Sequence, residues 1–574
     1  MDNFRLILLL SLAAVLFLIY QAWVADYGQP LQSVATAEAP DLSAPQLDVT
    51  TTDQPALPEE TLDAPPAAAV AVEAPVTGGA AAGSAVTGNT VDAAETITVE
   101  TDLVRARIST RGGTLQALWL KDYPAVADRP DDPLELLKPD PPNMFIVQSG
   151  LLGNGAAQLP THEAVFTAKQ NHYRLADDDN ELWVELTWQG EDGVQVTKRY
   201  GFERGSYLIR AEQILANGGA EPLAVRNYNQ LQRTEFIDTN ETKFGRKSYA
   251  GAAYYGPETK YKKETLEDME KRPLEVSITG GWIAMMQHYF MAAWIPQDNL
   301  LQTFYSKIAG DGRYIIGMYS PAETVSAGGT YTFNERLFVG PKLQDDLEKI
   351  APGLELSVDY GWLTIIAKPI FWLLEFIHSL IGNWGWAIII LTILIKAAFY
   401  KLSETSYKSM AHMRQVAPRL KALKDRYGDD KERLNQAMME LYKKEKINPL
   451  GGCLPILVQI PVFISLYWVL LQSVELRYAP FALWIQNLSA PDPYYVLPLI
   501  MGVSMFVQQK LNPPPPDPVQ EKIFMALPFV FTVFFAFFPS GLVLYWTVNQ
   551  LLSIAQQWYI TRKIEREDAA KHRA

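Results

Sequence analysis

The chain has 574 residues, with 50 Lys and Arg against 64 Asp and Glu, a formal net charge of −14, and 48% apolar residues. This length indicates several domains. An acidic chain is a poor ligand for nucleic acid, so we expect no direct nucleic-acid readout. The single cysteine excludes an internal disulfide framework and every multi-cysteine metal site.

The N-terminal stretch carries almost all of the net charge. No Lys or Arg lies between Arg5 and Arg105, whereas thirteen acidic residues do, so this stretch has a charge of −13 and leaves −1 for the rest. Residues 1–25 contain a long apolar run, which favours a transmembrane anchor over a cleaved signal peptide. Residues 26–95 are rich in Ala and Pro without an apolar period, which predicts a disordered acidic linker. The lack of Lys and Arg favours export of this linker from the cytoplasm.

Residues 96–350 consist of short runs in which apolar and polar residues alternate, separated by turns rich in Gly, Asn, Pro and Asp. A period of two predicts antiparallel strands with one buried face each, and hence an all-β sandwich. His162, His172 and His288 lie far apart and follow no catalytic or metal-binding spacing. We therefore expect no catalytic site in this domain.

From residue 360 onward, long apolar runs indicate a polytopic α-helical membrane protein. Five runs approach or reach the length of a span, and in chain order they are residues 384–400, 450–471, 494–507, 524–538 and 542–559. They assign span 2 to residues 383–402 and spans 3–6 to residues 448–560. Together with the anchor they give six spans.

Residues 360–382 are apolar but differ from the five runs. Thr364, Lys368, Glu375 and Ser379 recur at helical spacing and form one polar stripe. A helix with one charged face lies in the membrane interface instead of crossing it. We therefore predict an amphipathic interfacial helix.

Residues 403–447 form the most basic segment, with eleven Lys and Arg against seven acids. Such an excess marks the cytoplasmic side, so six spans place both termini and the basic tail at residues 561–574 in the cytoplasm. Gly428 is predicted to end one helix, and Asp429 with Glu432 to form the capping box of a second. The segment is thus predicted to be a helical hairpin.

Two functions remain open for this hairpin. It is either a docking arm for a ribosome or nascent chain, or a solvated loop whose basic residues only fix topology. The docking residues would be Arg419, Lys421, Lys424, Arg426, Lys431 and Arg433.

Lys396 is a charge within the predicted spans. A lysine at the membrane centre is unfavourable by about 2.5–3.5 kcal/mol, so we expect it to be solvated. Thr392 and Tyr400, one helical turn to either side, share its face. Polar residues on other spans would enclose a hydrophilic groove with it, open to the cytoplasm: Gln459, Gln508 and Asn549. The alternative is that Lys396 snorkels to the inner interface.

Several long motifs resemble the YidC/Oxa/Alb membrane protein insertases. They are residues 448–466 (NPLGGCLPILVQIPVFISL), 492–499 (DPYYVLPL), 538–546 (FPSGLVLYW) and the lysine-bearing span after GNWGWAIII. The anchor and large outer β-domain resemble the Gram-negative YidC type. This resemblance implies a protein of the bacterial inner membrane with residues 26–360 in the periplasm, and an insertase bundle made of five of the six spans.

The resemblance also implies the function. Such a protein is an insertase and chaperone, not an enzyme, and needs no cofactor. Its partners would be nascent membrane proteins, the Sec translocon, the ribosome and the phospholipid bilayer. The groove charge, here Lys396 with Thr392 beside it, would attract acidic tails of the substrate. The residues expected to touch its hydrophobic helix are Ile460, Phe463, Tyr545 and Trp546.

Lys396 departs from the family pattern, which usually has Arg at this position. The positive charge is kept, but the planar fork that binds a carboxylate at two points is lost. Two other functions stay open on the residues alone: a secondary transporter with an anion site at Lys396, and an envelope scaffold or carbohydrate-binding protein. The lack of an acidic partner within the spans and of an inverted repeat disfavours the transporter.

Overall fold

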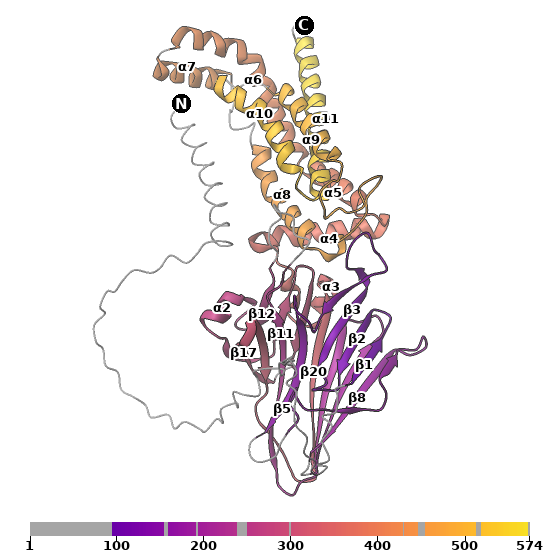
Figure 1. Ribbon diagram of the computed structural model, residues 1–574. Helices are drawn as coiled ribbons and strands as arrows, with labels where there is room; N and C mark the ends of the chain where they lie inside the picture. The colour runs from indigo at the N-terminus through magenta and orange to yellow at the C-terminus, as the bar shows by residue number, and fades with distance from the viewer. Residues whose placement is uncertain are drawn as a thin grey trace, which may run out of the picture.

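A computed structural model describes residues 95–571, apart from 154–158, 191–192, 238–248, 298–299, 429, 446–453 and 513–517. The predicted anchor at residues 1–25, and the predicted linker up to residue 94, lie outside the described residues. Figure 1 shows three levels: a β-sandwich at one end, a helix lying across the top of the sandwich, and a helical bundle with a projecting helical pair.

The β-sandwich consists of two mainly antiparallel sheets. The 11-stranded sheet runs β14 (Glu275–Thr279), β17 (Leu301–Ala309), β18 (Arg313–Tyr319), β11 (Leu223–Thr234), β5 (Phe145–Gly153), β3 (Leu115–Pro124), β2 (Val104–Ser109), β1 (Thr96–Glu100), β7 (His172–Arg174), with β19 (Glu323–Val325) on β11 and β4 (Pro133–Leu137) on β3. The 9-stranded sheet runs β13 (Lys262–Glu264), β12 (Gly251–Tyr255), β15 (Trp282–Met286), β16 (Phe290–Ile295), β20 (Thr330–Pro341), β10 (Leu208–Asn217), β9 (Val194–Glu203), β8 (Glu181–Gln189), β6 (Thr167–Ala168).

Alternating strands build the core of the sandwich, as β10 illustrates. Ile209, Ala211 and Leu215 are buried in the cluster between the sheets, whereas Arg210 and Glu212 face outward. A period of two puts alternate side chains on opposite faces, so one face of the strand is apolar. The predicted β-sandwich is confirmed.

Strand β15 breaks this alternation because both of its faces are buried. Ile283 and Met285 belong to the core between the sheets. Trp282, Ala284 and Met286 belong to a second apolar cluster that continues into the helices. The strand therefore joins the sandwich to the helical part of the chain.

The helical region follows the sandwich. Its α-helices are α3 (Gln344–Ile350), α4 (Thr364–Ile381), α5 (Trp384–Ala398), α6 (Tyr400–Tyr427), α7 (Lys431–Lys444), α8 (Leu454–Gln472), α9 (Val496–Leu511), α10 (Pro518–Phe535) and α11 (Ser540–Lys571). The sandwich contributes α2 (Leu266–Lys271), and short 3₁₀ turns are η2 (Gly310–Gly312), η3 (Leu354–Ser357), η4 (Gly361–Leu363) and η6 (Val474–Leu476). The helical C-terminal region is confirmed, and α5 and α8–α11 coincide with the five predicted apolar runs to within a few residues, except for α11, which extends into the predicted tail.

Helix α4 lies across the base of the bundle, next to the sandwich (Figure 1). Ala367, Ile370 and Leu374 are buried on one face, while Ile365 and Trp372 are exposed on the other. By length and apolarity alone, Gly361–Ile381 could also cross a membrane. The interfacial position of this helix stays a prediction.

The helix that begins predicted span 2 ends before residue 402. Helix α5 stops at Ala398, and the following helix α6 starts at Tyr400 with a bend of 66° between the two. The predicted range of span 2, residues 383–402, extends past this bend, and Tyr400, predicted on the face of Lys396, follows the bend. Tyr400 belongs to α6 and is 37% exposed.

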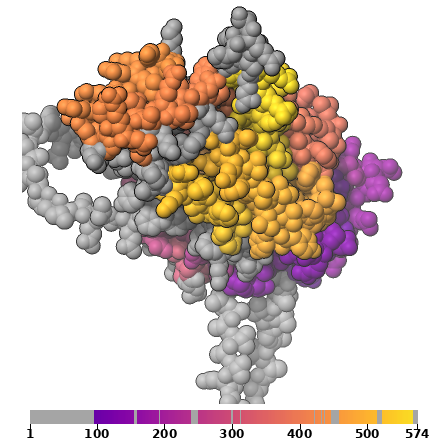
Figure 2. All heavy atoms as spheres, turned by 90° about the horizontal axis from the view of Figure 1, so that it is seen from above, coloured from indigo at the N-terminus to yellow at the C-terminus, as the bar shows by residue number. Residues whose placement is uncertain are grey.

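Helices α6 and α7 form the projecting pair, which Figure 2 shows to one side of the bundle. The Arg419 guanidinium of α6 pairs with the Glu445 carboxylate, just after α7, at 2.7 Å. The N-cap of α7 is Asp430, whose carboxylate accepts a hydrogen bond from the Arg433 amide. The predicted cap at Asp429 is thus one residue early, and Asp429 itself lies outside the described residues.

Two of the long motifs meet at the end of the bundle next to the sandwich. The Asp492 carboxylate accepts hydrogen bonds from the Trp484 indole at 3.0 Å and from the Leu497 amide at 2.7 Å, which caps α9. The Ser540 amide, at the start of α11, donates to the Ala490 carbonyl at 2.7 Å. Because these bonds link the starts of α9 and α11, they fix the spacing of two helices that line the site.

Candidate substrate groove

A pocket of about 270 Å³ lies between α8, α9, α10 and α11. Its wall is both polar and aromatic. The lining residues are Gln459, Ile460, Phe463, Met505, Gln508, Gln509, Asn512, Phe524, Leu527, Pro528, Phe531, Tyr545, Trp546, Asn549, Gln550 and Ser553. We call this pocket the groove.

The groove contains seven of the residues singled out from the sequence. They are the three predicted polar residues Gln459, Gln508 and Asn549, and the four predicted substrate contacts Ile460, Phe463, Tyr545 and Trp546. These residues come from α8, α9 and α11, and the bundle brings them to one wall although up to 90 residues separate them in the chain.

Aromatic side chains form the apolar side of the groove. The Phe463 ring packs edge-on against Trp546 with ring centroids 4.6 Å apart, and lies 6.2 Å from the Tyr545 ring. Edge-to-face pairs of this kind stabilise packing beyond the area that they bury. The Trp546 indole N–H is buried without a hydrogen-bond partner in the described part of the chain.

Lys396 does not itself line the groove but hydrogen-bonds with a residue that does. Its ammonium donates a hydrogen bond to the Ser553 hydroxyl at 2.7 Å, and the side chain is buried. Ser553 itself lines the groove. Lys401, in contrast, is 91% exposed on α6. The Lys396 ammonium thus lies inside the bundle and not beside Lys401 at its edge.

Thr392 lies one turn before Lys396 on α5 and is also buried. Its hydroxyl donates to the Ile388 carbonyl of its own helix at 2.7 Å. Thr392 does not line the groove, and Tyr400 lies beyond the bend at Phe399. Of the two predicted partners of Lys396 on this segment, Thr392 lies on the same helix, α5, and Tyr400 lies on α6.

The predicted docking residues lie on α6 and α7. Arg419 pairs with Glu445, Arg433 pairs with Asp430, and the Arg426 guanidinium lies over the Tyr427 ring. Lys424 also lies on α6, while the side chains of Lys421 and Lys431 fall outside the described ones. The charges of this hairpin are therefore partly neutralised within it.

Ser553 is a residue of the site that the sequence reasoning missed. Ser553 follows Asn549 by one helical turn, so it shares the face that lines the groove. The i to i+4 spacing from Asn549 was the available signal for Ser553.

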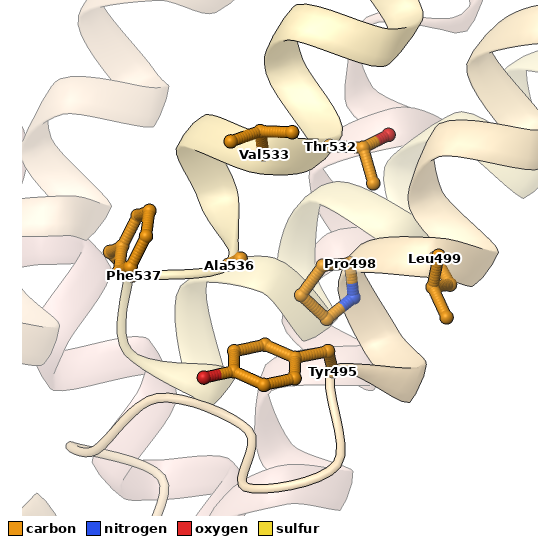
Figure 3. A pocket seen from close by; sticks show the side chains of 7 residues that line it. All are labelled: Tyr495, Pro498, Leu499, Thr532, Val533, Ala536 and Phe537. Carbon is orange, nitrogen blue, oxygen red and sulfur yellow. The ribbon is translucent and has the colours of Figure 1, made fainter.

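A second pocket, of about 310 Å³, lies between α9 and α10 at the end of the bundle nearest the sandwich (Figure 3). It is lined by Tyr495, Pro498, Leu499, Thr532, Val533, Ala536 and Phe537. None of these side chains is an amide, so the pocket lacks the polar lining of the groove. Among the described residues, no group of three or more His, Cys, Asp or Glu is placed to hold a metal ion.

Comparison with known proteins gives two family matches along the chain. The profile of the YidC periplasmic domain matches residues 96–373, and that of the 60Kd inner membrane protein matches residues 376–567. The membrane protein insertase YidC of Thioalkalivibrio sulfidiphilus is 51% identical over 580 residues, covering 99% of each chain. That of Methylococcus capsulatus is 50% identical over 569 residues, covering 99% of this chain and 100% of its own.

A solved structure of an active YidC insertase shares 18% identity and covers 82% of this chain and 93% of its own, with a TM-score of 0.37. The assignment rests on the sequence matches and not on that superposition. Those matches and the groove define a membrane protein insertase of the inner membrane with a periplasmic domain, which is not an enzyme. The chain belongs to the YidC family. The transporter and scaffold readings are not favoured by these relatives.

Proposed function

We propose that the groove receives the hydrophobic segment of a nascent membrane protein while Lys396 attracts acidic residues next to that segment. The observation that carries this proposal is the meeting of seven predicted residues in one pocket, behind which Ser553 holds the Lys396 ammonium. The aromatic side of the pocket suits an apolar helix, and the amide side suits a polar tail.

The energetic reason is the transfer of polar groups into hydrocarbon. An unpaired amide or hydroxyl costs several kcal/mol there, on the order of 2–7 depending on the reference state. Gln459, Gln508 and Asn549 offer hydrogen-bond partners to such groups inside the bundle. A polar tail can therefore exchange its hydrogen bonds with water for hydrogen bonds with these side chains while it crosses part of the membrane.

The topology that supports this function has six spans with both termini in the cytoplasm. In this arrangement α5 and α8–α11 are five of the spans, and the N-terminal anchor is the sixth. Helix α4 lies in the outer interface, and the basic pair α6 and α7 lies in the cytoplasm as the positive-inside rule requires. The groove then opens toward the side from which substrates arrive.

The partners proposed on this basis are the ribosome and the Sec translocon. Arg419, Arg426 and Arg433 lie on the helical pair that projects from the cytoplasmic end. Basic side chains there suit the phosphate backbone of ribosomal RNA or an acidic ribosomal protein. In cooperation with Sec, the translocon would pass a single-span substrate to the groove.

The test is crosslinking to a stalled nascent chain. A photoreactive residue at Phe463 should crosslink the hydrophobic segment strongly because Phe463 lines the groove. The matched control is Val503, an apolar residue on α9 that is 65% exposed and does not line the groove. Equal crosslinking from the two positions, or crosslinking from Val503 alone, would contradict the proposal.

A further inference from the structure

Exposed arginines gather on the outward face of the 11-stranded sheet, at the edge formed by β3, β2, β1 and β7. Figure 1 shows β1, β2 and β3 side by side there. Ala106 and Ile108 of β2 belong to the core between the sheets. Because side chains alternate along a strand, Arg105 and Arg107 point outward. Arg174 of β7 lies in the same row as Arg105, and all three arginines are exposed.

Trp119 of β3 lies beneath two of these arginines. The guanidinium carbon of Arg105 is 4.6 Å from the centre of the Trp119 ring, and that of Arg107 is 5.0 Å from it. A guanidinium that stacks on an aromatic ring keeps its planar fork of N–H groups for a carboxylate. We call Arg105, Arg107, Arg174 and Trp119 the basic platform.

The basic platform carries an excess of positive charge. None of its three arginines forms an ion pair with a carboxylate of the described residues. Two acids share this face of the sheet. Glu100 pairs with Lys121 at 3.4 Å, and Glu135 of β4 lies opposite Trp119 in the strand register. The four cations of this face therefore outnumber its two carboxylates.

The sandwich contains a second arrangement of two arginines on one tryptophan, and that one is neutralised. On the 9-stranded sheet, Arg199 and Arg210 lie 4.3 and 5.0 Å from the centre of the Trp183 ring. Arg199 pairs with Glu185 at 3.1 Å, and Arg210 pairs with Glu181. The same packing thus occurs once with carboxylates in place and once without them.

The acidic linker joins the sandwich at the basic platform. Its last described residue, Glu95, bonds through its backbone to Thr110, and β1 begins at the next residue. Residues 26–94 hold ten acids and no Lys or Arg. The densest group of acids, residues 59–63, ends 33 residues before Thr96. A flexible chain of that length has an end-to-end distance of about 30 Å, which gives its carboxylates a millimolar effective concentration at the platform.

We propose that residues 26–94 dock on the basic platform of their own chain. Their carboxylates supply the partners that Arg105, Arg107 and Arg174 lack among the described residues. Because exposed charges are screened by salt, the docked linker exchanges readily and is released as the ionic strength rises. While it is docked, it covers a surface that would otherwise attract acidic segments of other polypeptides.

The test couples carboxylates to amines with a carbodiimide, using the full chain in lipid nanodiscs. Arg105→Lys together with Arg107→Lys keeps the charge of the platform and supplies the amines, and mass spectrometry identifies the acids that they couple. The matched control is Arg199→Lys together with Arg210→Lys, whose amines lie among carboxylates of their own sheet.

The platform variant should couple to acids of residues 26–94 about tenfold more than the control variant does, because the platform attracts the linker electrostatically. Raising the salt from about 0.05 M to about 0.5 M should lower this coupling roughly fivefold, since the screening length shortens from more than 10 Å to a few ångströms. Equal linker coupling in the two variants, or coupling that salt leaves unchanged, would overturn the proposal.

A mixture of unlabelled chains and chains labelled with heavy nitrogen separates the two possible sources of the linker. Coupling within chains of one isotope supports docking on the same chain. If most linker crosslinks join the two isotopes, the linker comes from a second copy and the proposal falls. It also falls if the platform amines couple only to acids of the sandwich.

Discussion

The imidazole Nε2 of His288 lies 2.7 Å from the carbonyl oxygen of Leu471, and this bond joins the β-sandwich to the end of α8. His288 lies in the turn between β15 and β16. Beside it, the Arg477 guanidinium lies 5.4 Å from the Phe290 ring and donates to the Ala125 carbonyl at 3.4 Å. The segment after α8 is therefore held between two loops of the sandwich.

We expect His288→Ala to loosen this junction. A neutral hydrogen bond contributes about 0.5–1.5 kcal/mol, so the open population should rise roughly threefold to tenfold. Trypsin cleavage after Arg477, which lies under the Phe290 ring when the junction is closed, measures that opening. Cleavage after Lys169, an exposed residue of the sandwich, is the control. An unchanged rate at Arg477 would show that the bond does not hold the junction.

The same histidine predicts a pH dependence. Burial lowers the pKa of His288 to about 4, and the positive charges of Lys342 and Arg477 act in the same direction. The folded protein therefore favours the neutral ring, whose Nε2–H donates to Leu471. The stability from this group is complete above its unfolded pKa of 6.5 and is lost as the pH falls from 6.5 toward 4.

His288→Gln isolates this effect because an amide can donate to the Leu471 carbonyl but does not titrate. When the pH is lowered from 7 to 4.5, the melting temperature of the native protein should fall more than that of this variant. A difference that stays constant across that range would contradict the prediction.

Lys198 is a buried lysine that links the two sheets. From β9 its ammonium donates to the Gly112 carbonyl at 2.6 Å and to the Ser149 carbonyl at 2.9 Å. Lys198→Met should destabilise the sandwich by about 2–4 kcal/mol because two buried carbonyls lose their donor. Thermal unfolding of the full chain measures the loss, with Lys169→Met on the exposed edge as control.

Lys198 also titrates within an accessible range. Burial lowers its pKa from 10.5 to about 7, so the folded state disfavours the charged form. That penalty is complete below pH 7 and disappears as the pH rises toward 10.5, so this group makes the sandwich more stable with rising pH. This rise of stability with pH should vanish in Lys198→Met. If the rise persists in that variant, other groups cause it.

The outlines of the helices could be predicted from the sequence because apolar runs of span length leave few alternatives. The end of α5 could not be predicted from the sequence. No Gly or Pro lies at residues 398–400, and the bend depends on the packing of α6 against α11, which involves Tyr407, Ile560 and Ile564. The position of Tyr400 is set by that tertiary contact and not by local propensity.

The groove was predictable where residue type carries its chemistry. Glutamines, an asparagine and a lysine stand out among apolar neighbours, so Gln459, Gln508 and Asn549 could be found. Ser553 could not be singled out in this way, because serine is common in membrane helices and its importance comes from its hydrogen bond with Lys396 on another helix. The burial of both faces of strand β15 could not be predicted from its sequence either, because it depends on the second apolar cluster, which continues into the helices.

Gly502 lets α9 approach α10 beside the pocket of Figure 3. A Cβ at this position would overlap the Thr532 hydroxyl, which donates to the Pro528 carbonyl at 2.7 Å. Gly502→Ala should therefore separate the two helices and lower stability by about 1–3 kcal/mol. Thr532→Ala should restore most of that loss in the double variant, as thermal unfolding in nanodiscs would show. If Gly502→Ala lowers stability equally in the native protein and in the Thr532→Ala variant, the contact with Thr532 is not the cause.

The charge of Lys396 should matter for what is inserted more than for whether the protein folds. Lys396→Glu should slow insertion of substrates with acidic tails by roughly tenfold, since replacing the attraction by a repulsion changes the interaction free energy by about 1.4 kcal/mol in total. A neutral-tailed version of the same substrate should be affected much less. Lys396→Arg should be tolerated because attraction needs only the positive charge, and Lys401→Glu, at an exposed site, should have little effect. Insertion into reconstituted vesicles measures all four. Unchanged insertion of acidic tails by Lys396→Glu would mean that the groove attracts its substrates through its aromatic and amide walls alone.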